Sequence, residues 1–399
     1  MVLKEAIKKA IALQREEILS REPGAPRDIL QSIDLSLPPA HIISGIRRCG
    51  KSTVLCQLLQ KRENAYYINF EDPRILGFKV SDFSKLEEAF IEAFGKSNYY
   101  FFDEIQNVPS WEMAIRRLLD AGKRCVITGS NASLLSRELG TRLTGRHLSW
   151  ELFPFSYGEA LRFSGEKPSH KSFESYSRTG GFPEFLKHGR TEVLQELLSD
   201  IVERDVAMRH RIEAGRRVTE LAVYLLSNVG KPFSFTKLAS AFEVTPATMI
   251  SYVSHLEDSY LLFTVPMFSR SLRRQKINPK KAYGIDVGLC RANSLSFSDD
   301  QGGVLENLVF LHLRRQHKEI YYFKGKQECD FIVRDRNKGM AAYQVCYDVN
   351  EDNLKREMGG LKEAMEALKL KEGVIITSNQ EDYVEGIRLV PAWKWMSSG

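Results

Sequence analysis

The chain has 399 residues, more than one ordinary hydrophobic core accommodates, which predicts two or three domains. Hydrophobic residues make up 43% of it, which excludes general disorder, and no apolar run reaches the length that crosses a bilayer. The net charge of +6 at pH 7 is too small for a dedicated nucleic-acid coat protein.

The N-terminus carries charge throughout residues 1–22, so it lacks the apolar middle of a secretory signal. It predicts an amphipathic helix that ends near Pro23 and Gly24. The six cysteines are scattered without close pairs at metal or redox spacing, and several lie in apolar runs that favour buried thiols. The eight histidines are dispersed as well. These features predict a cytoplasmic protein without a structural metal.

The first half of the chain alternates short apolar runs with amphipathic segments, the pattern of a parallel sheet covered by helices. The expected strands are His41–Ser44, Ala65–Phe70, Tyr99–Phe102, Arg124–Thr128 and His147–Leu152. The expected helices are Ser52–Lys61, Phe83–Phe94 and Met113–Ala121.

The segment GIRRCGKS, from Gly45 to Ser52, matches every fixed position of a phosphate-binding P-loop. Gly45 and Gly50 let backbone N–H groups curl around a phosphate at a helix N-terminus. Lys51 is expected to reach the β- and γ-phosphates of ATP, and Ser52 to offer its hydroxyl to Mg²⁺. The predicted nucleotide-binding residues are Gly45, Ile46, Arg47, Arg48, Cys49, Gly50, Lys51, Ser52 and Thr53.

A partner motif follows at Tyr99–Glu104, where four apolar residues end in two acids. A buried strand of a parallel sheet delivers Asp103 to the edge where the P-loop lies. We expect Asp103 to hold Mg²⁺ and Glu104 to orient or deprotonate the attacking water. A strand that ends in two solvated acids is the alternative, and the preceding P-loop disfavours it.

The strand Arg124–Thr128 leads into Ser130 and Asn131, polar residues at the position of a γ-phosphate sensor. Asn131 is favoured over Ser130, and a simple helix cap is the alternative. Arg142 and Arg146 follow as candidates for an arginine finger that acts on the ATP of a neighbouring subunit, with Arg146 the stronger candidate. An ordinary surface arginine is the alternative for both.

Residues 155–211 predict mostly helix, interrupted at Gly180–Pro183. Helices at 218–227, 235–242 and 246–259, with a turn at 243–245, predict a helix-turn-helix. A strand at 260–265 and a basic hairpin follow, which completes the order of a winged helix. The helix at 246–259 has no Arg or Lys, which disfavours reading of base sequence.

The basic hairpin is still suited to DNA backbone, although a solvated loop or a protein-contact module is the alternative. Its predicted DNA-binding residues are Arg270, Arg273, Arg274, Lys276, Lys280 and Lys281. After Gly302 and Gly303 a second α/β unit is expected. Its predicted elements are helices at 304–317 and 353–368 and strands at 320–324, 329–334, 341–347 and 373–377.

The motifs GIRRCGKS, FFDEIQNV, ITGSNASLLS and LTGRHLSWELFPFSYGEAL, in this order, resemble a family of archaeal and bacterial AAA-type ATPases. TGGFPEFL and KAYGIDVGL resemble the middle region of that family, and GVLENLVFLHLRR with ECDFIV its C-terminal domain. The resemblance covers nearly the whole chain and implies an α/β fold in four parts. These are an AAA-like P-loop NTPase domain with a parallel sheet at 1–153, a helical lid at 154–215, a winged helix at 216–298 and a restriction-endonuclease-like α/β domain at 299–399.

The resemblance also implies functional residues. Gly50, Lys51, Ser52, Asp103 and Glu104 would bind and hydrolyse ATP, with Asn131 as sensor. Gly181 and Pro183 look like the Gly-x-Pro element that brings a lid near the nucleotide in related ATPases, and an ordinary interhelical loop is the alternative.

Endonucleases of the C-terminal type hold Mg²⁺ with an Asp and with a Glu-x-Lys pair on the next strand. Glu306 and Asp330 stand at matching places, but Gln344 and Cys346 replace the expected Glu and Lys. A neutral amide and a thiol supply neither the charge nor the ammonium that this chemistry needs. We therefore expect a DNA-binding or structural relic, with Asp348 nearby as a spare carboxylate.

These patterns predict an ATPase with ATP and Mg²⁺ as cofactors that acts on DNA, branched or single-stranded DNA included, as a switch or as a homo-oligomeric translocase, away from membranes. A signalling or scaffold ATPase that controls protein assembly is the alternative. An ATP-gated nuclease is the weaker alternative.

Overall fold

The computed structural model describes residues 2–62, 64–130, 143, 145–295, 300–335 and 339–397. The chain divides into two compact units, Met1–Leu152 and Phe153–Gly399. The finer division of the second unit into lid, winged helix and C-terminal domain stays a prediction. None of the described helices is long and apolar enough to span a membrane. All six cysteines are free and buried, whereas the sequence indicated burial only for several of them.

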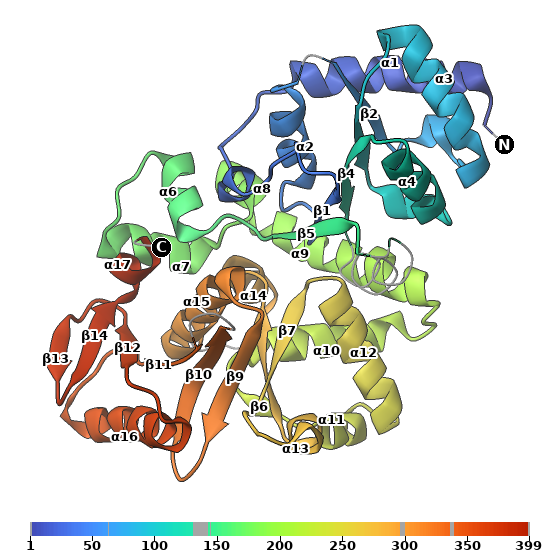
Figure 1. Cartoon of the computed structure of the whole chain (residues 1–399). Coiled ribbons are helices and arrows are strands. Elements are labelled where there is room, and N and C mark those ends of the chain that lie inside the picture. The colour runs from blue at the N-terminus through green and yellow to red at the C-terminus, as the bar shows by residue number, and fades with distance from the viewer. Residues whose placement is uncertain are drawn as a thin grey trace. The chain divides into compact units, whose positions relative to one another are not determined.

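The first unit is built on a parallel sheet of five strands in the order β2-β3-β4-β1-β5 (Figure 1). Because the strands are parallel, all of them end at the same edge, and β4 places its end between those of β1 and β3. The α/β fold with a parallel P-loop sheet is thus confirmed. The strands are β1 Ala40–Gly45, β2 Ala65–Asn69, β3 Tyr99–Asp103, β4 Arg124–Gly129 and β5 His147–Leu152.

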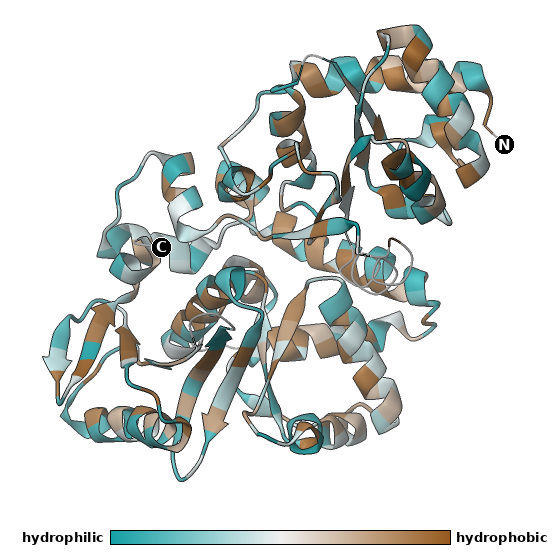
Figure 2. Cartoon of the chain, in the orientation of Figure 1, coloured by the Kyte–Doolittle hydropathy of each residue, from teal (hydrophilic) through white to brown (hydrophobic). Residues whose placement is uncertain are grey.

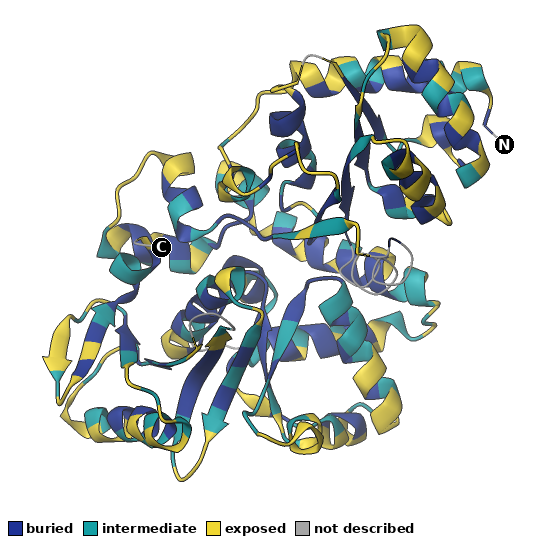
Figure 3. Cartoon of the chain, viewed as in Figure 1, coloured by how far each residue is buried: buried dark blue, intermediate teal, exposed yellow. Residues whose placement is uncertain are grey.

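Side chains alternate between the two faces of the sheet along each strand. Helices cover both faces and pack on these side chains. Ile42 of β1 and Phe102 of β3 belong to a buried core shared with α1, α3 and α4. Their neighbours Ile43 and Phe101 are equally buried, and α2 contacts β1, β3 and β4. Figure 2 shows apolar and polar residues interleaved along α1, α3 and α4, and Figure 3 shows that the strands are buried whereas the outer faces of these helices are exposed. The helices are α1 Lys4–Ser20, α2 Lys51–Leu59, α3 Phe83–Phe94 and α4 Trp111–Asp120.

The second unit begins with helices, as predicted. Helix α9 continues into a π-helical segment, Ile201–Met208. A π-helix is rare in this length and often marks a functional position. The helices are α6 Tyr157–Ser164, α7 His170–Thr179, α8 Pro183–His188, α9 Thr191–Asp200 and α10 Gly215–Ser227.

A three-stranded antiparallel sheet in the order β6-β8-β7 follows. Along the chain, two helices lie between β6 and β7. The predicted basic hairpin is the β7–β8 pair, and its tip holds an additional short helix, α13. The elements are β6 Pro232–Phe233, α11 Phe235–Ala241, α12 Pro246–Asp258, β7 Leu262–Pro266, α13 Leu272–Ile277, β8 Lys280–Gly284 and α14 Val287–Asn293.

The C-terminal part contains a mixed sheet of six strands in the order β13-β14-β12-β11-β10-β9. Strands β11, β12 and β14 are parallel, and the other pairs are antiparallel. The sequence predicted β9 to β12 but not the edge strand β13 or its neighbour β14. The elements are α15 Gln301–Gln316, β9 Glu319–Lys324, β10 Glu328–Asp335, β11 Gly339–Val345, α16 Glu351–Leu368, β12 Gly373–Thr377, β13 Asp382–Val384, β14 Ile387–Pro391 and α17 Ala392–Ser397.

Candidate nucleotide site and acidic centre

The P-loop joins the buried strand β1 to helix α2. Gly45 approaches β5 so closely that a Cβ atom would lie 2.1 Å from the carbonyl oxygen of Leu152, so only glycine fits. Arg48 (φ 62°) and Gly50 (φ 100°) adopt left-handed backbone, which turns the loop. Gly50 then precedes the first turn of α2, whose leading N–H groups have no partner inside the helix. This strand, turn and helix start form the arrangement that binds phosphate in P-loops.

Lys51 is buried and folds back onto the loop. Its ammonium donates to the carbonyl oxygens of Gly45 at 3.1 Å and Ile46 at 3.2 Å, and lies 3.7 Å from the carboxylate of Glu104. A charged phosphate oxygen is a stronger acceptor than these neutral carbonyls. The lysine is therefore held where an anionic ligand of the loop would attract it. Of the remaining loop residues, Ile46 and Cys49 are buried, Ser52 and Thr53 are half-buried, Arg48 is exposed, and Arg47 lies 3.6 Å from Glu71.

Asp103 ends β3 and is fully buried. Its carboxylate accepts hydrogen bonds from the Tyr67 hydroxyl at 3.2 Å and from the hydroxyls of Thr128 and Ser52. Burial, and then the charge of Glu104, raise the pKa of Asp103. A carboxylate whose charge is disfavoured in this way gains from a cation beside it, and carboxylate and hydroxyl oxygens are the ligands that Mg²⁺ prefers. Ser52 and Asp103 thus fit the predicted Mg²⁺ site.

Glu104 follows with φ 50° and is held by two neighbours. Its backbone N–H donates to the Thr128 hydroxyl oxygen at 3.1 Å, and its carboxylate accepts a hydrogen bond from the Gln106 amide. The Gln106 amide also lies 3.4 Å from the Ser130 hydroxyl. Ser130, the second choice for the sensor, is therefore next to the residue that holds Glu104. The first choice, Asn131, lies outside the described residues, as does Arg142.

Sequence reasoning missed Tyr67, Gln106 and Thr128. Thr128 is a hydroxyl residue in the otherwise apolar end of β4, at the edge where β1 and β3 also end, and this was the available signal. Tyr67 is contributed by the neighbouring strand β2, in which Asn69 pairs with Asp103. Its role depends on strand pairing that a single sequence does not display.

Arg146 lies directly before β5, at the opposite edge of the sheet from the P-loop of its own chain. His147 pairs with Ala40 at the start of β1, whereas the P-loop follows Gly45 at its end. Its guanidinium forms an ion pair with Asp120 at 2.5 Å. Arg146 is therefore placed away from its own nucleotide site, and its role toward a neighbouring subunit stays a prediction.

The basic segment divides into two kinds of residue. Arg270, Arg273, Arg274 and Lys276 are exposed at and beside α13, and Lys280 is half-buried over the ring of Phe235. Lys281, in contrast, is 2% exposed and points into the protein. The prediction that Lys281 contacts DNA is therefore wrong, because its charge is enclosed and neutralised by carboxylates.

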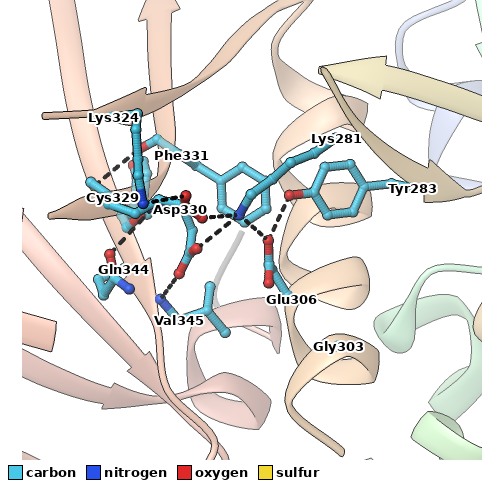
Figure 4. A network of polar contacts seen from close by, with 12 residues as sticks. Lys281, Tyr283, Gly303, Glu306, Lys324, Cys329, Asp330, Phe331, Gln344 and Val345 are labelled. Atoms are coloured by element: carbon cyan, nitrogen blue, oxygen red, sulfur yellow. Dashed lines mark hydrogen bonds and ion pairs between the residues drawn. The ribbon is translucent and has the colours of Figure 1, made fainter. Parts of the chain in front are cut away.

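Figure 4 shows Glu306 and Asp330 beside Lys281. We call the group Lys281, Glu306, Glu328 and Asp330 the acidic centre. The ammonium lies 2.9 Å from Glu306, 2.9 Å from Glu328 and 3.2 Å from Asp330. The lysine comes from β8, whereas the acids come from α15 and β10, so the acidic centre ties the three-stranded sheet to the C-terminal sheet. Glu328 also pairs with Lys324 at 3.2 Å.

Further hydrogen bonds fix the acids of the centre. Tyr283 donates its hydroxyl to Glu306 at 2.6 Å, and the backbone N–H of Val345 donates to Asp330 at 3.0 Å. Burial, and then the charge of Asp330, raise the pKa of Glu306 to about 7. Burial opposes the charge of Lys281, but the carboxylates outweigh it and raise its pKa.

Gln344 and Cys346 occupy different surroundings in β11 and just beyond it. The Gln344 amide accepts from the backbone N–H of Asp330 at 3.3 Å and donates to Glu357 of α16 at 2.7 Å. Cys346 belongs to the hydrophobic core between the sheet and α16. A polar cavity of about 510 Å³ borders the acidic centre, with Glu306, Asp330, Gln344 and Glu357 in its lining.

Comparison with protein families supports the fold of the first unit. The AAA domain family matches residues 38–161, which include the P-loop and the Asp103–Glu104 pair. Two domains of unknown function, DUF8612 and DUF4143, match residues 170–300 and 301–395. The solved structure of Cdc6p from Pyrobaculum aerophilum aligns with 70% of this chain and 89% of its own length at 13% identity, but the TM-score of 0.24 is too low to support any argument.

Similar proteins extend over the whole chain. Uncharacterized protein MJ1544 of Methanocaldococcus jannaschii is 33% identical over 432 aligned positions, which cover 99% of this chain and 96% of the relative. An uncharacterized protein of Haemophilus influenzae is 27% identical, and the similarity covers 89% of this chain and 93% of that protein. With its P-loop, parallel sheet and full-length similarity to MJ1544, the chain belongs to a family of AAA-type P-loop ATPase proteins with a DUF4143 domain at the C-terminus.

Proposed function

We propose that this protein hydrolyses ATP in the presence of Mg²⁺. The observation that carries the proposal is the convergence of Lys51, Ser52, Asp103 and Glu104 at one edge of the sheet, with Ser52 bonded to Asp103 and Lys51 3.7 Å from Glu104. Ile46 to Thr53 would bind the phosphates, and Ser52 and Asp103 would hold Mg²⁺. The metal, when bound, neutralises charge on the β- and γ-phosphate oxygens.

In the proposed reaction, Glu104 orients a water molecule and accepts its proton. The water oxygen attacks the γ-phosphorus, the bond between this phosphorus and the β–γ bridging oxygen breaks, and ADP and phosphate leave. Lys51 stabilises the charge that develops on the phosphate oxygens. Thr128 and Gln106 hold Glu104 from two sides, through its backbone and its carboxylate.

We further propose that the ATPase acts on DNA through a winged helix at residues 216–298. The order of α10, β6, α11, α12, β7 and β8 supports this interpretation, and the exposed cations of the hairpin tip suit the phosphate backbone. Affinity would then depend on salt and little on base sequence. We infer that the protein works in the cytoplasm as a homo-oligomer, in which Arg146 would reach a neighbouring nucleotide.

A scaffold ATPase that controls protein assembly is the second candidate. The exposed positions of α12 favour it, because Ala247, Ile250 and Ser251 offer no cation to a phosphate or a guanine.

The deciding experiment compares ATP hydrolysis by the wild type and Glu104→Gln, with and without duplex, single-stranded and branched DNA. Hydrolysis that depends on Mg²⁺ and falls about 100-fold in Glu104→Gln would establish the ATPase. Stimulation by DNA that disappears in the variant would establish DNA as the partner. Hydrolysis that no DNA changes would favour the scaffold role, and no hydrolysis by the wild type would refute the proposal.

A further inference from the structure

Arg27 is a buried arginine that no part of the P-loop pattern includes. Its guanidinium lies beneath the loop, where Nη1 donates to the carbonyl oxygen of Cys49 at 2.8 Å. Only 3% of the residue is exposed. The neighbouring segment is held on α2, because the amide of Gln57 donates to the carbonyl oxygens of Pro23 and Ala25. The backbone just before Arg27 is thus fixed on α2, and this holds the guanidinium next to the loop.

The bond from Arg27 determines how one peptide of the loop is oriented. In a trans peptide the carbonyl and the following N–H point in opposite directions. Since the carbonyl of Cys49 is directed at Arg27, the N–H of Gly50 is directed away from it. P-loops bind phosphate through N–H groups such as this one, and a carbonyl in the same place would repel the anion.

Gly50 makes this peptide easy to turn over. Glycine populates both signs of φ almost equally, and Gly50 has φ 100°. A half-turn of the Cys49–Gly50 peptide therefore meets little steric resistance from residue 50 itself. A Cβ atom on Gly50 would lie 3.2 Å from the Arg27 guanidinium, so the arginine also closes the space beneath the loop.

We propose that Arg27 is a positioning residue for nucleotide binding, which holds the Cys49–Gly50 peptide in the orientation that presents the Gly50 N–H to phosphate. The inference rests on the proposed binding of ATP. Arg27 would not touch the nucleotide and would act through the loop backbone. Its loss would weaken the binding of every ligand that carries the phosphates, whatever the base.

The test compares wild type, Arg27→Gln, Arg27→Lys and Arg21→Gln, an exposed arginine of the same segment. Binding of Mg-ADP and of inorganic tripolyphosphate is measured by calorimetry, and KM and kcat for ATP by steady-state kinetics. In Arg27→Gln we expect the Kd of both ligands and the KM to rise at least 10-fold, with kcat within about threefold. Arg27→Lys should recover part of the affinity, and Arg21→Gln should match the wild type.

A purely structural role predicts a different result. Partial unfolding lowers the active fraction, and therefore kcat, but leaves the KM of the folded molecules unchanged. A KM and tripolyphosphate affinity within twofold of the wild type in Arg27→Gln would overturn the inference and leave the ATPase proposal intact. If Arg27→Gln does not fold, Arg27→Lys is compared with the wild type by the same measurements. A KM and a tripolyphosphate affinity within twofold of the wild type in Arg27→Lys would then overturn the inference. The variant Lys51→Ala is expected to bind neither ligand. If the wild type also binds neither ligand, the ATPase proposal and this inference are both overturned.

Discussion

The hydroxyl of Thr128 donates to the carboxylate of Asp103, and the same oxygen accepts the backbone N–H of Glu104 at 3.1 Å. One side chain at the end of β4 therefore fixes both Asp103, which ends β3, and Glu104, which follows it. The acid expected to hold Mg²⁺ and the acid expected to activate water do not sit independently. Their relative position is set by a residue that neither binds metal nor carries charge.

Replacing Thr128 with valine, which keeps the shape but removes the hydroxyl, should lower kcat for ATP hydrolysis about 10- to 100-fold. Asp103 loses a hydrogen bond and the Glu104 N–H loses its acceptor, so both acids shift from their positions. The KM for ATP should change less than threefold. Thr377→Val is the matched control, since Thr377 is also fully buried and bonded, to the Gln380 carbonyl, but lies in the second unit. Equal kcat in Thr128→Val and wild type would contradict this role.

Replacing Lys281 with methionine should destabilise the second unit by about 3–5 kcal/mol, because it leaves the buried carboxylates of the acidic centre without their cation. Urea unfolding at pH 7 measures the loss. Lys280→Met, at the half-buried neighbouring position, should change stability by less than about 1 kcal/mol. Adding Glu306→Gln to Lys281→Met should restore part of the stability by removing one charge. A second unit equally stable with and without Lys281 would show that the acidic centre does not hold the sheets together.

Stability should fall as the pH drops from about 7 toward 4.5, in part through two stacked histidines. The rings of His210 and His255 lie 3.6 Å apart, and burial lowers both pKa values, that of His210 to about 4. A histidine with a lowered pKa binds fewer protons in the folded than in the unfolded state between pH 4 and 6.5, so acid favours unfolding. The contribution is about 1 kcal/mol, since both residues are only partly buried and solvent screens their charge.

Urea unfolding at pH 7 and pH 5 checks this contribution in wild type, His210→Phe and His188→Phe. His210→Phe keeps an aromatic ring beside His255 but does not titrate, so the acid-induced loss should become smaller. His188 is exposed, and its replacement should leave the loss unchanged. An identical loss in wild type and His210→Phe would assign it to other groups.

Neutralising Arg273, Arg274 and Lys276 together with glutamine should weaken DNA binding and reduce its dependence on salt. Each phosphate contact releases counterions, so removal of three contacts should reduce the slope of log K against log salt by roughly 2.7. Fluorescence anisotropy from 50 to 200 mM salt measures this. The matched control replaces Lys167, Lys171 and Lys187, which are exposed elsewhere in the second unit. Unchanged binding in the first triple variant would move the DNA site away from the hairpin.

The sequence predicted the strands and helices around the P-loop well, because local patterns determine them. Gly45 to Ser52 and Asp103–Glu104 each lie in a single continuous segment that carries its own signal. Arg27, Tyr67 and Thr128 are different, since their importance comes from contacts with residues 22 to 36 positions away. Such contacts depend on strand order and on loop paths, which one sequence does not reveal.

Lys281 is a residue that the sequence assigned to the wrong surroundings, again because its contacts are distant in the chain. In the sequence it is one of several cations in a basic run, and charge alone grouped it with its neighbours. The period of strand β8 turns Lys281 inward, toward acids that follow 25 to 49 residues later. Successive residues of a strand point to opposite faces, so the cations of a basic run that continues into a strand do not all share one surface.

The acidic centre also crosses a boundary between families. Lys281 lies in the stretch that matches DUF8612, and Glu306, Glu328 and Asp330 lie in the stretch that matches DUF4143. If the two stretches were separated at residue 300, one fragment would keep Lys281 without its carboxylates, and the other would keep the three acids with only Lys324 beside Glu328. Gene fusion or domain shuffling at this point would thus be selected against, and the two stretches should be inherited together as a single evolutionary unit.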